Sequence, residues 1–147
     1  MCIRDRADAL SRGLEDAGLD AHRVGEGYAG RSGWLQVDPL WASRAARAQL
    51  LVSAPGMAAL SIARVYQRPI ILVVSDQPEQ TSNAARARQL QLLHRVVTWR
   101  GDPADFRRQV AEAARQLSAA APAPDVILGN QRAQARIDAW ASRLLGL

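Results

Sequence analysis

The stretch QLLVSAPGMAALSIARVYQRPIILVVSDQPEQTSNA, residues 49–84, decides the fold of this chain. Residues 49–53 and 70–74 are apolar runs, and the second consists only of β-branched residues and leucine, as strands covered on both faces tend to be. Between them, residues 56–67 carry apolar side chains close to helical spacing, and Pro69 prevents that helix from continuing. The stretch therefore predicts a strand, a helix and a second strand, followed by another helix.

The connections between these elements predict where a ligand binds. Parallel strands joined by a helix follow a right-handed crossover. Because of this rule, residues 54–56 and 75–78 should both lie at the carboxyl edge of the sheet, where open α/β folds bind their ligands. We therefore expect the functional site at these two loops.

The segments on either side continue the alternation of helices and strands. We expect further helices at residues 7–17, 39–46, 79–93, 104–117 and 130–145, and further strands at 19–24, 34–37 and 95–99. Asp38 and Asp102 are suitable N-caps, and Gly18 suits the end of the first helix. The remaining segments are a flexible Gly-rich link at 25–33, a linker at 119–124 and a short strand or turn at 125–129. The predicted fold class is α/β, a Rossmann-like parallel sheet flanked by helices.

The net charge of +5 and the isoelectric point of about 10.9 raise the question of nucleic-acid binding. All 19 basic residues are arginine and none is lysine, as the codon choice of a GC-rich genome favours. The arginines are dispersed, mostly over expected exposed helix faces, among them Arg44, Arg47, Arg64, Arg86, Arg88, Arg107, Arg108, Arg132 and Arg136. A solvated surface explains them, and we expect no nucleic-acid partner.

The first six residues, MCIRDR, resemble the translation of a transposon-based sequencing adapter, a contaminant of assembled metagenomic reading frames. We therefore expect residues 1–6 to be an artefact and residues 7–147 to be part of a longer protein. Without Cys2 no cysteine remains, which excludes disulfides, thiolate metal sites and cysteine nucleophiles. No apolar run approaches the ~20 residues of a membrane span and no signal peptide is legible, so we expect a cytoplasmic location.

The central stretch resembles the donor-binding half of GT-B glycosyltransferases, in particular the family 28 group that includes the N-acetylglucosaminyltransferase of lipid II synthesis. The matching pieces are LLVSAPG (50–56), GMAALSIARVYQRP (56–69), IILVV (70–74) and DQPEQTSNA (76–84). Relatives carry an EQ-x-x-NA signature, which residues 79–84 match. The resemblance covers most of residues 7–147 in the order of elements, and residues 49–84 in motifs.

The resemblance implies a donor site for a nucleoside-diphosphate sugar, with a UDP-sugar favoured. The first turn of the helix at 56–67 would hold a phosphate through backbone N–H groups and the helix dipole, and small side chains would let the phosphate approach. The Glu79 carboxylate would accept hydrogen bonds from ribose hydroxyls, Gln80 can both donate and accept, and Asn83 would brace the loop. The expected donor-site residues are Ser53, Gly56, Met57, Ala58, Ala59, Asp76, Glu79, Gln80 and Asn83.

One position departs from the pattern of the family. The lipid II enzyme group carries a glutamate about six residues after the glycine, and the matching position here is Ile62. Either Glu79 takes over the ribose contact of that glutamate, or the site is altered. We therefore assign the chain to the wider superfamily without a peptidoglycan role.

The resemblance also implies that the acceptor site and the catalytic base lie in an amino-terminal domain that is absent here, together with the first strand of the sheet. We expect this part to bind a nucleotide weakly and to transfer no sugar alone. In the intact hexosyltransferase, transfer would be inverting and need neither metal nor cofactor, because the helix dipole stabilises the leaving group. The apolar face of the final helix, with Ile137, Trp140, Ala141 and Leu144, would be partly exposed.

Other interpretations of the same residues stay open. Glu79 and Gln80 suit the first turn of a helix without any ligand, and Gly56 suits a tight turn. His22 and His94 lack a neighbouring carboxylate pattern, which favours a surface or partly buried role for both. The same fold also serves nucleotide-sugar hydrolases and epimerases, and a non-enzymatic Arg-rich α/β binding module is a further alternative.

Overall fold

Three parallel strands form the main sheet of the computed structural model, which describes residues 3–28 and 30–146. The strands lie in the order β3 (Leu51–Ser53), β4 (Ile70–Val74) and β5 (His94–Thr98), with β4 in the centre. The register pairs Leu51 with Ile70 and Ile70 with His94, so the three strands begin at one edge and end at the other. A separate parallel pair joins β1 (Arg23–Val24) to β2 (Trp34–Leu35).

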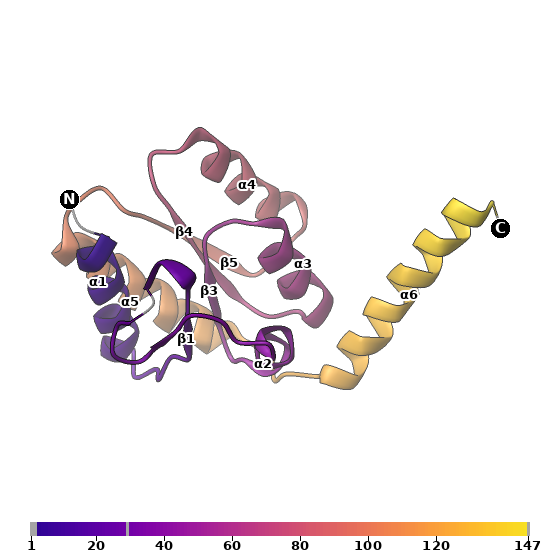
Figure 1. Ribbon diagram of the computed structural model, residues 1–147, viewed down its shortest axis with the longest axis horizontal. Coiled ribbons are helices and arrows are strands. Elements are labelled where there is room, and N and C mark those ends of the chain that lie inside the picture. Colours follow the sequence, from indigo (N-terminus) through magenta and orange to yellow (C-terminus); the bar gives the residue numbers. More distant parts are fainter. Residues whose placement is uncertain (1–2, 29, 147) are drawn as a thin grey trace.

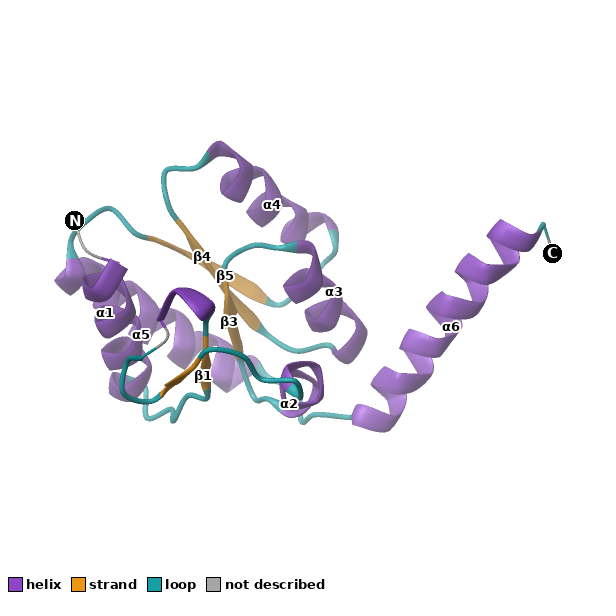
Figure 2. Cartoon of the chain, in the orientation of Figure 1, coloured by secondary structure: helices purple, strands orange, loops and turns teal. Residues whose placement is uncertain are grey.

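Helices connect and cover these strands. They are α1 (Ile3–Asp16), α2 (Trp41–Arg47), α3 (Met57–Tyr66), α4 (Pro78–Gln89), α5 (Pro103–Ala120) and α6 (Val126–Leu145), with a short 3-10 turn, η1, at Glu26–Tyr28. α3 and α4 pack on one face of the main sheet, and α1 and α5 pack on the other (Figures 1 and 2). The structure thus confirms the α/β class, with short parallel sheets packed against helices.

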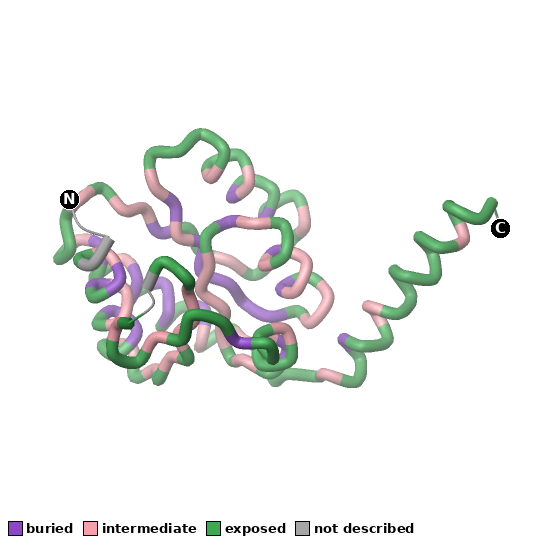
Figure 3. Tube along the Cα trace, in the orientation of Figure 1, coloured by how far each residue is buried: buried purple, intermediate pink, exposed green. Residues whose placement is uncertain are grey.

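The central strand β4 is buried on both faces. Ile70, Leu72 and Val74 pack against α3 and α4, whereas Ile71 and Val73 belong to the cluster formed with α1 and α5. Figure 3 shows this strand as a buried segment between exposed helix faces. Double-sided burial explains why the sequence of β4 is a continuous apolar run without polar alternation.

α1 and α5 approach each other closely at Gly13. A β-carbon at this position would lie 2.8 Å from the carbonyl oxygen of Arg107 and 2.8 Å from the Val110 side chain. The Asp16 carboxylate accepts hydrogen bonds from the Arg107 guanidinium at 2.5 and 2.7 Å. These hydrogen bonds hold the pKa of Asp16 below its ordinary value. The contact fixes α1 on the face of the sheet that α5 covers.

α1 ends close to its predicted place, and it begins four residues before the predicted start. α1 begins at Ile3, so the boundary predicted between residues 6 and 7 falls within a helix. Gly18 has a φ of 76°, and the Leu19 N–H donates to the Leu14 carbonyl at 3.0 Å. This is the pattern in which a glycine ends a helix in the left-handed conformation, as predicted.

Three predicted boundaries are wrong for local reasons. The helix predicted from residue 39 begins at Trp41, because the Asp38 carboxylate accepts a hydrogen bond from the Leu40 N–H at 2.9 Å and closes a turn first. The helix predicted to reach residue 93 ends at Gln89, since the chain turns at Gln91. Residues 125–129 form neither a strand nor an isolated turn: Asp125 caps α6 by accepting from the Leu128 N–H at 2.9 Å. Smaller differences are the two-residue strands at 23–24 and 34–35 and the extension of α5 to residue 120.

α6 docks on the end of α3 by its first turns and then projects from the fold (Figures 1 and 2). Gly129 makes this docking possible, because a β-carbon there would lie 2.1 Å from the Tyr66 ring. The Tyr66 hydroxyl donates to Asn130 Oδ1 at 2.6 Å. Further along, Trp140 and Leu144 are 66% and 68% exposed, which confirms the predicted exposed apolar face. Within the described ranges, no helix combines the length and the apolarity needed to cross a membrane.

Candidate functional site

The carboxyl ends of β3, β4 and β5 are followed by loops at residues 54–56, 75–77 and 99–102. The predicted site residues come from the first two loops, from the end of β3 and from the helices that follow. The Asn83 side-chain amide of α4 donates to the Pro55 carbonyl at 3.2 Å, so α4, which follows the second loop, is joined to the first loop. The fold therefore brings the two predicted segments together at one edge of the sheet.

α3 begins at this edge without a side-chain cap. Gly56 is its N-cap residue, with extended backbone angles (φ −124°, ψ 157°) that any residue adopts, so turn geometry does not require glycine here. The first N–H groups of a helix lack partners within the helix and carry the positive end of its dipole. A β-carbon on Gly56 would meet nothing within 4 Å. The start of α3 is therefore open to an approaching anion.

The other residues around this helix start differ in exposure. The Ser53 hydroxyl donates to the Ala54 carbonyl at 2.8 Å. Ala58 is exposed, whereas Ala59 is partly buried against the cluster beneath α3. Met57 is 53% exposed, and its sulfur lies 3.5 Å from Arg86 Nη1 of α4.

Arg86 is a residue that sequence reasoning treated as surface charge. Its guanidinium contacts the Met57 side chain at the start of α3 and forms no ion pair with any carboxylate of the described chain. The signal that could have found it is the spacing within α4, because Arg86 lies three residues after Asn83, on the same side of the helix.

Gln80 holds the loop after β4 in place. Its side-chain oxygen accepts hydrogen bonds from the Ser75 N–H at 2.8 Å and from the Ser75 hydroxyl at 3.0 Å. Its amide nitrogen donates to Gln77 Oε1 at 3.1 Å. Two acceptor positions and one of two donor hydrogens are thus in use, which leaves one N–H for a ligand. Gln80 is above all a residue that positions this loop.

Asn83 braces a different loop from the one expected. We predicted that it supports the loop after β4, and its side chain instead contacts Pro55 in the loop after β3. Pro55 is buried, so this hydrogen bond joins the start of α3 to the middle of α4. The reason is the parallel packing of α3 and α4 on one face of the sheet, which a local sequence window does not reveal.

Asp76 and Glu79 are exposed carboxylates at the same edge. Neither forms a hydrogen bond or an ion pair with another residue in the part of the chain that the structure describes. Glu79 stands in the first turn of α4, where a negative charge interacts favourably with the helix dipole. Both side chains are available to accept hydrogen bonds from hydroxyl groups of a ligand.

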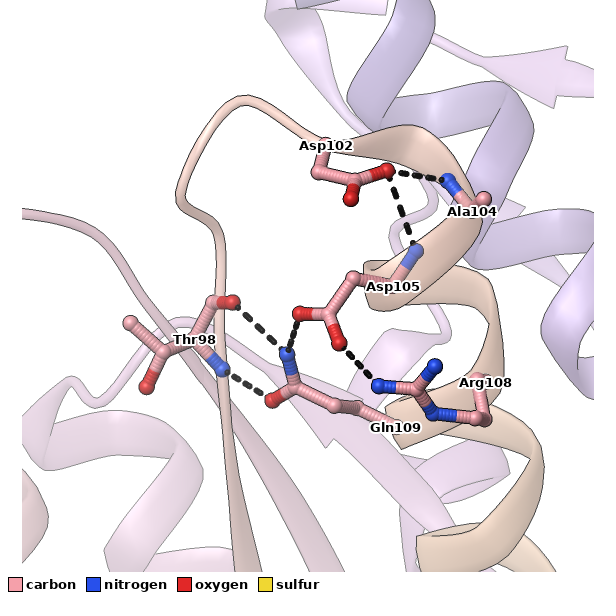
Figure 4. A network of polar contacts seen from close by, with 6 residues as sticks. All are labelled: Thr98, Asp102, Ala104, Asp105, Arg108 and Gln109. Atoms are coloured by element: carbon pink, nitrogen blue, oxygen red, sulfur yellow. Dashed lines mark hydrogen bonds and ion pairs between the residues drawn. The ribbon is translucent and has the colours of Figure 1, made fainter.

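The third loop at this edge is ordered by a polar network (Figure 4). Gln109 of α5 accepts from the Thr98 N–H at 3.0 Å and donates to the Thr98 carbonyl at 3.2 Å and to Asp105 Oδ2 at 2.6 Å. Asp105 also pairs with Arg108. Asp102 Oδ1 accepts from the N–H groups of Ala104 at 3.0 Å and Asp105 at 3.2 Å, which confirms the predicted N-cap. The network closes the free side of β5 at its last residue, and we assign it a structural role.

His22 does have a carboxylate neighbour, contrary to the sequence interpretation. Its Nε2 atom lies 2.8 Å from Asp38 Oδ2, and Arg44 Nε lies 2.8 Å from the same oxygen. The hydrogen bond from the Leu40 N–H, together with those from His22 and Arg44, keeps the pKa of the buried Asp38 below its ordinary value. This cluster lies just before α2, in the segment that precedes the main sheet.

The family carries a glutamate where α3 has Ile62, so α3 supplies no carboxylate at this position. The Ile62 side chain is partly buried.

Among residues 3–28 and 30–146, no group of three or more His, Cys, Asp or Glu side chains could hold a metal ion. Two cavities, of about 590 and 650 Å³, are lined by other residues than the predicted site. The predicted site residues lie on loops and helix starts at the carboxyl edge of the sheet.

Comparison of the chain with protein-family models, curated proteins and solved structures yields no match.

Proposed function

We propose that the carboxyl edge of the main sheet binds the nucleoside diphosphate of a sugar donor, with UDP favoured. The chain would then be the donor-binding part of a GT-B type glycosyltransferase. The observation that carries this proposal is the uncapped start of α3, which lies at the same edge of the sheet as two unpartnered carboxylates, Asp76 and Glu79. The motif resemblance of residues 79–84 to family 28 supports the same function.

The start of α3 would bind the phosphates. Backbone N–H groups of Met57, Ala58 and Ala59 would donate to phosphate oxygens, and the helix dipole would stabilise their charge. The bare Gly56 leaves room for close approach. Arg86, beside Met57, would add one positive charge from α4.

The loop after β4 would bind the ribose. A carboxylate only accepts hydrogen bonds, which matches a pair of hydroxyl donors. The hydrogen bonds between Gln80 and Ser75 order the loop that precedes Glu79, which supports this role. In this arrangement Glu79 would replace the carboxylate that the family carries at the position of Ile62.

The same groups would serve the reaction of the intact enzyme. Breaking the bond between sugar and diphosphate leaves negative charge on the diphosphate, and preorganised N–H groups at a helix start stabilise such charge without a metal ion. The sugar would pass to an acceptor hydroxyl with inversion. We assign no catalytic base to a residue of this chain.

Calorimetric titration of the 147-residue chain with UDP tests the proposal, with GDP and dTDP as comparators. We expect saturable binding of one nucleotide. Glu79→Ala should weaken it about tenfold, the loss expected for hydrogen bonds to a charged group. Gly56→Val should abolish the UDP binding that depends on Glu79, without lowering the midpoint of thermal unfolding, since the new side chain meets no protein atom near its β-carbon.

The matched control is Glu26→Ala, which removes the same charge from an exposed position in the turn at Glu26–Tyr28. This control should bind UDP like the unchanged chain. Absence of saturable binding to a folded sample, or unchanged affinity in both site variants, would contradict the proposal.

A further inference from the structure

A cavity of about 650 Å³ lies at the opposite, amino edge of the main sheet. It is lined by the last residues of α3, by the turn between α4 and β5, by Pro122 and by residues 132–136 of α6. Four arginines line it: Arg64, Arg68, Arg132 and Arg136. No carboxylate lines it among the residues that the structure describes. Its volume lies within the ~300–1,000 Å³ typical of small-molecule sites.

Arg68 is the buried charge of this cavity. The residue is only 2% exposed, and its guanidinium donates to the carbonyls of Tyr66, Ala48, Pro122 and Ala123 at 2.9–3.3 Å. It forms no ion pair with a described carboxylate. A buried charge is costly unless an opposite charge or several hydrogen bonds compensate it, and here carbonyl dipoles alone do so.

The other three arginines are more accessible. Arg132 Nη1 donates to the Val65 carbonyl at 3.3 Å. Arg64 and Arg136 are exposed and form no hydrogen bond or ion pair with the described part of the chain. All four guanidinium groups therefore lie around one cavity without a carboxylate counter-ion.

Helix dipoles neutralise this charge only in part. The carboxyl ends of α3 and α4 both lie here, and each carries the equivalent of roughly half a negative charge. Their sum, about one negative charge, stands against four guanidinium groups. An excess of positive charge remains, and a bound anion would compensate it.

Two glutamines with unfavourable backbone conformations line the same cavity. Gln67 after α3 and Gln91 after α4 have φ angles of 49° and 55°, and they are the only non-glycine residues with positive φ in the described chain. Glycine is the common residue at this position after a helix, because other residues are strained there. Both glutamine side chains are exposed and free of hydrogen bonds to described residues, so two amide donors are available to a ligand.

We propose that this cavity is a second binding site, for a small organic anion with at least two negative charges, such as a phosphate or diphosphate ester. Guanidinium groups and amide N–H groups are the donors that phosphate oxygens prefer. Leucine side chains from the turn between α4 and β5 would contact the apolar part of the ligand. The site is separate from the proposed donor site, because the two lie at opposite ends of the same parallel strands.

Calorimetric titration with inorganic pyrophosphate tests this inference, with phosphate and citrate as comparators. We expect saturable binding that weakens with added salt. Arg64→Gln and Arg136→Gln should each weaken it about tenfold, as expected for the loss of a charge-assisted hydrogen bond. Arg12→Gln is the matched control, since Arg12 is exposed on α1 at the other face of the sheet.

Gln67→Gly separates a binding role from a structural one. It should raise the midpoint of thermal unfolding because it removes the strained backbone, and it should weaken pyrophosphate binding because it removes an amide donor. Gly56→Val should leave pyrophosphate bound in this cavity, which separates the result from the proposed donor site. The inference is overturned if no saturable binding occurs, or if Arg12→Gln lowers the affinity as much as Arg64→Gln and Arg136→Gln.

Discussion

The two edges of the main sheet carry different sets of charged side chains. At the carboxyl edge, α3 and α4 begin, and the charged side chains without a described partner are the carboxylates Asp76 and Glu79 and the guanidinium of Arg100. At the amino edge the same helices end, and the side chains around the cavity include four arginines without a carboxylate. Interaction with the helix dipoles explains why carboxylates lie near the helix starts and arginines near the helix ends. Four arginines at the amino edge are more than the two helix dipoles would balance.

The edges also differ in what holds them in place. Side-chain amides order the carboxyl edge, since Gln80 holds the loop after β4 and Asn83 holds the loop after β3. A buried guanidinium orders the amino edge, where Arg68 joins three segments through backbone carbonyls. We therefore expect substitutions at the amino edge to affect stability more than substitutions at the carboxyl edge.

The largest effect is expected at Arg68. Arg68→Met should lower the free energy of unfolding by about 3 kcal/mol, because the carbonyls that it bonds lose a charged donor in a buried place. Arg88→Met is the control, as Arg88 is exposed on α4 without a described partner, and it should change stability by less than about 0.5 kcal/mol. Denaturant unfolding measures both. Equal effects of the two substitutions would remove the proposed difference between the edges.

Replacing a glycine with alanine at each edge should give the next largest effect on stability, and the two sites should differ. Gly129→Ala should cost about 2 kcal/mol, because its β-carbon would lie 2.1 Å from the Tyr66 ring and helix α6 would have to move. Gly56→Ala should cost less than about 0.5 kcal/mol, because its β-carbon would meet nothing within 4 Å. Limited proteolysis of α6 alongside thermal unfolding should show faster cleavage for Gly129→Ala only. Equal cleavage of both variants would contradict the described docking of α6.

Replacing either of the two glutamines with positive φ by glycine should instead increase the stability of the fold. Gln67→Gly and Gln91→Gly should each raise the free energy of unfolding by about 1 kcal/mol, since glycine adopts the left-handed conformation without strain. Gln89→Gly, at the last helical residue of α4, should lower it slightly instead. Denaturant unfolding compares the three variants. Destabilisation by Gln67→Gly and Gln91→Gly would mean that their side chains contribute more to the fold than the backbone costs.

A smaller effect, on pH dependence, is expected away from both edges at Asp38. Its pKa is lowered in the folded chain by the Leu40 N–H, His22 and Arg44, so its contribution to stability is present above the ordinary pKa of aspartate, about 3.9. The contribution is lost as the pH falls from there through the lowered value. Asp38→Asn should therefore flatten the pH dependence of the thermal midpoint below about pH 4. An unchanged pH profile would contradict this assignment.

Local patterns predicted most of the fold. The apolar run of β4, the breaking effect of Pro69 and the caps Gly18 and Asp102 all act within a few residues, and the structure confirms them. The carboxyl-edge loops followed from the handedness of the crossovers. A hydrogen bond from Asn83 to Pro55 also joins two of the predicted site regions, α4 and the loop after β3.

Long-range contacts were not predictable in the same way. The arginines at 64, 68, 132 and 136 look dispersed along the sequence, and only the docking of α6 on α3 gathers them around one cavity. The neighbours His22 and Asp38 are 16 residues apart, and no periodic pattern relates them. Residues 125–129 were wrongly predicted to form a strand or turn, because a short apolar run shows no helical or strand periodicity. They form the start of α6, which Asp125 caps.

The proposed nucleotide site lies at the carboxyl edge of the main sheet, separate from the proposed anion cavity at the amino edge. The most direct test follows the backbone amide resonances of the 147-residue chain by NMR during a titration with UDP. We expect saturable shifts at residues 56–59 and 75–80 that are lost in Gly56→Val, whereas any shifts at residues 67 and 91, from UDP in the anion cavity, should persist in that variant. This result would support the proposed nucleotide site. Shifts confined to residues 67 and 91, or no saturable shift at either edge, would contradict it.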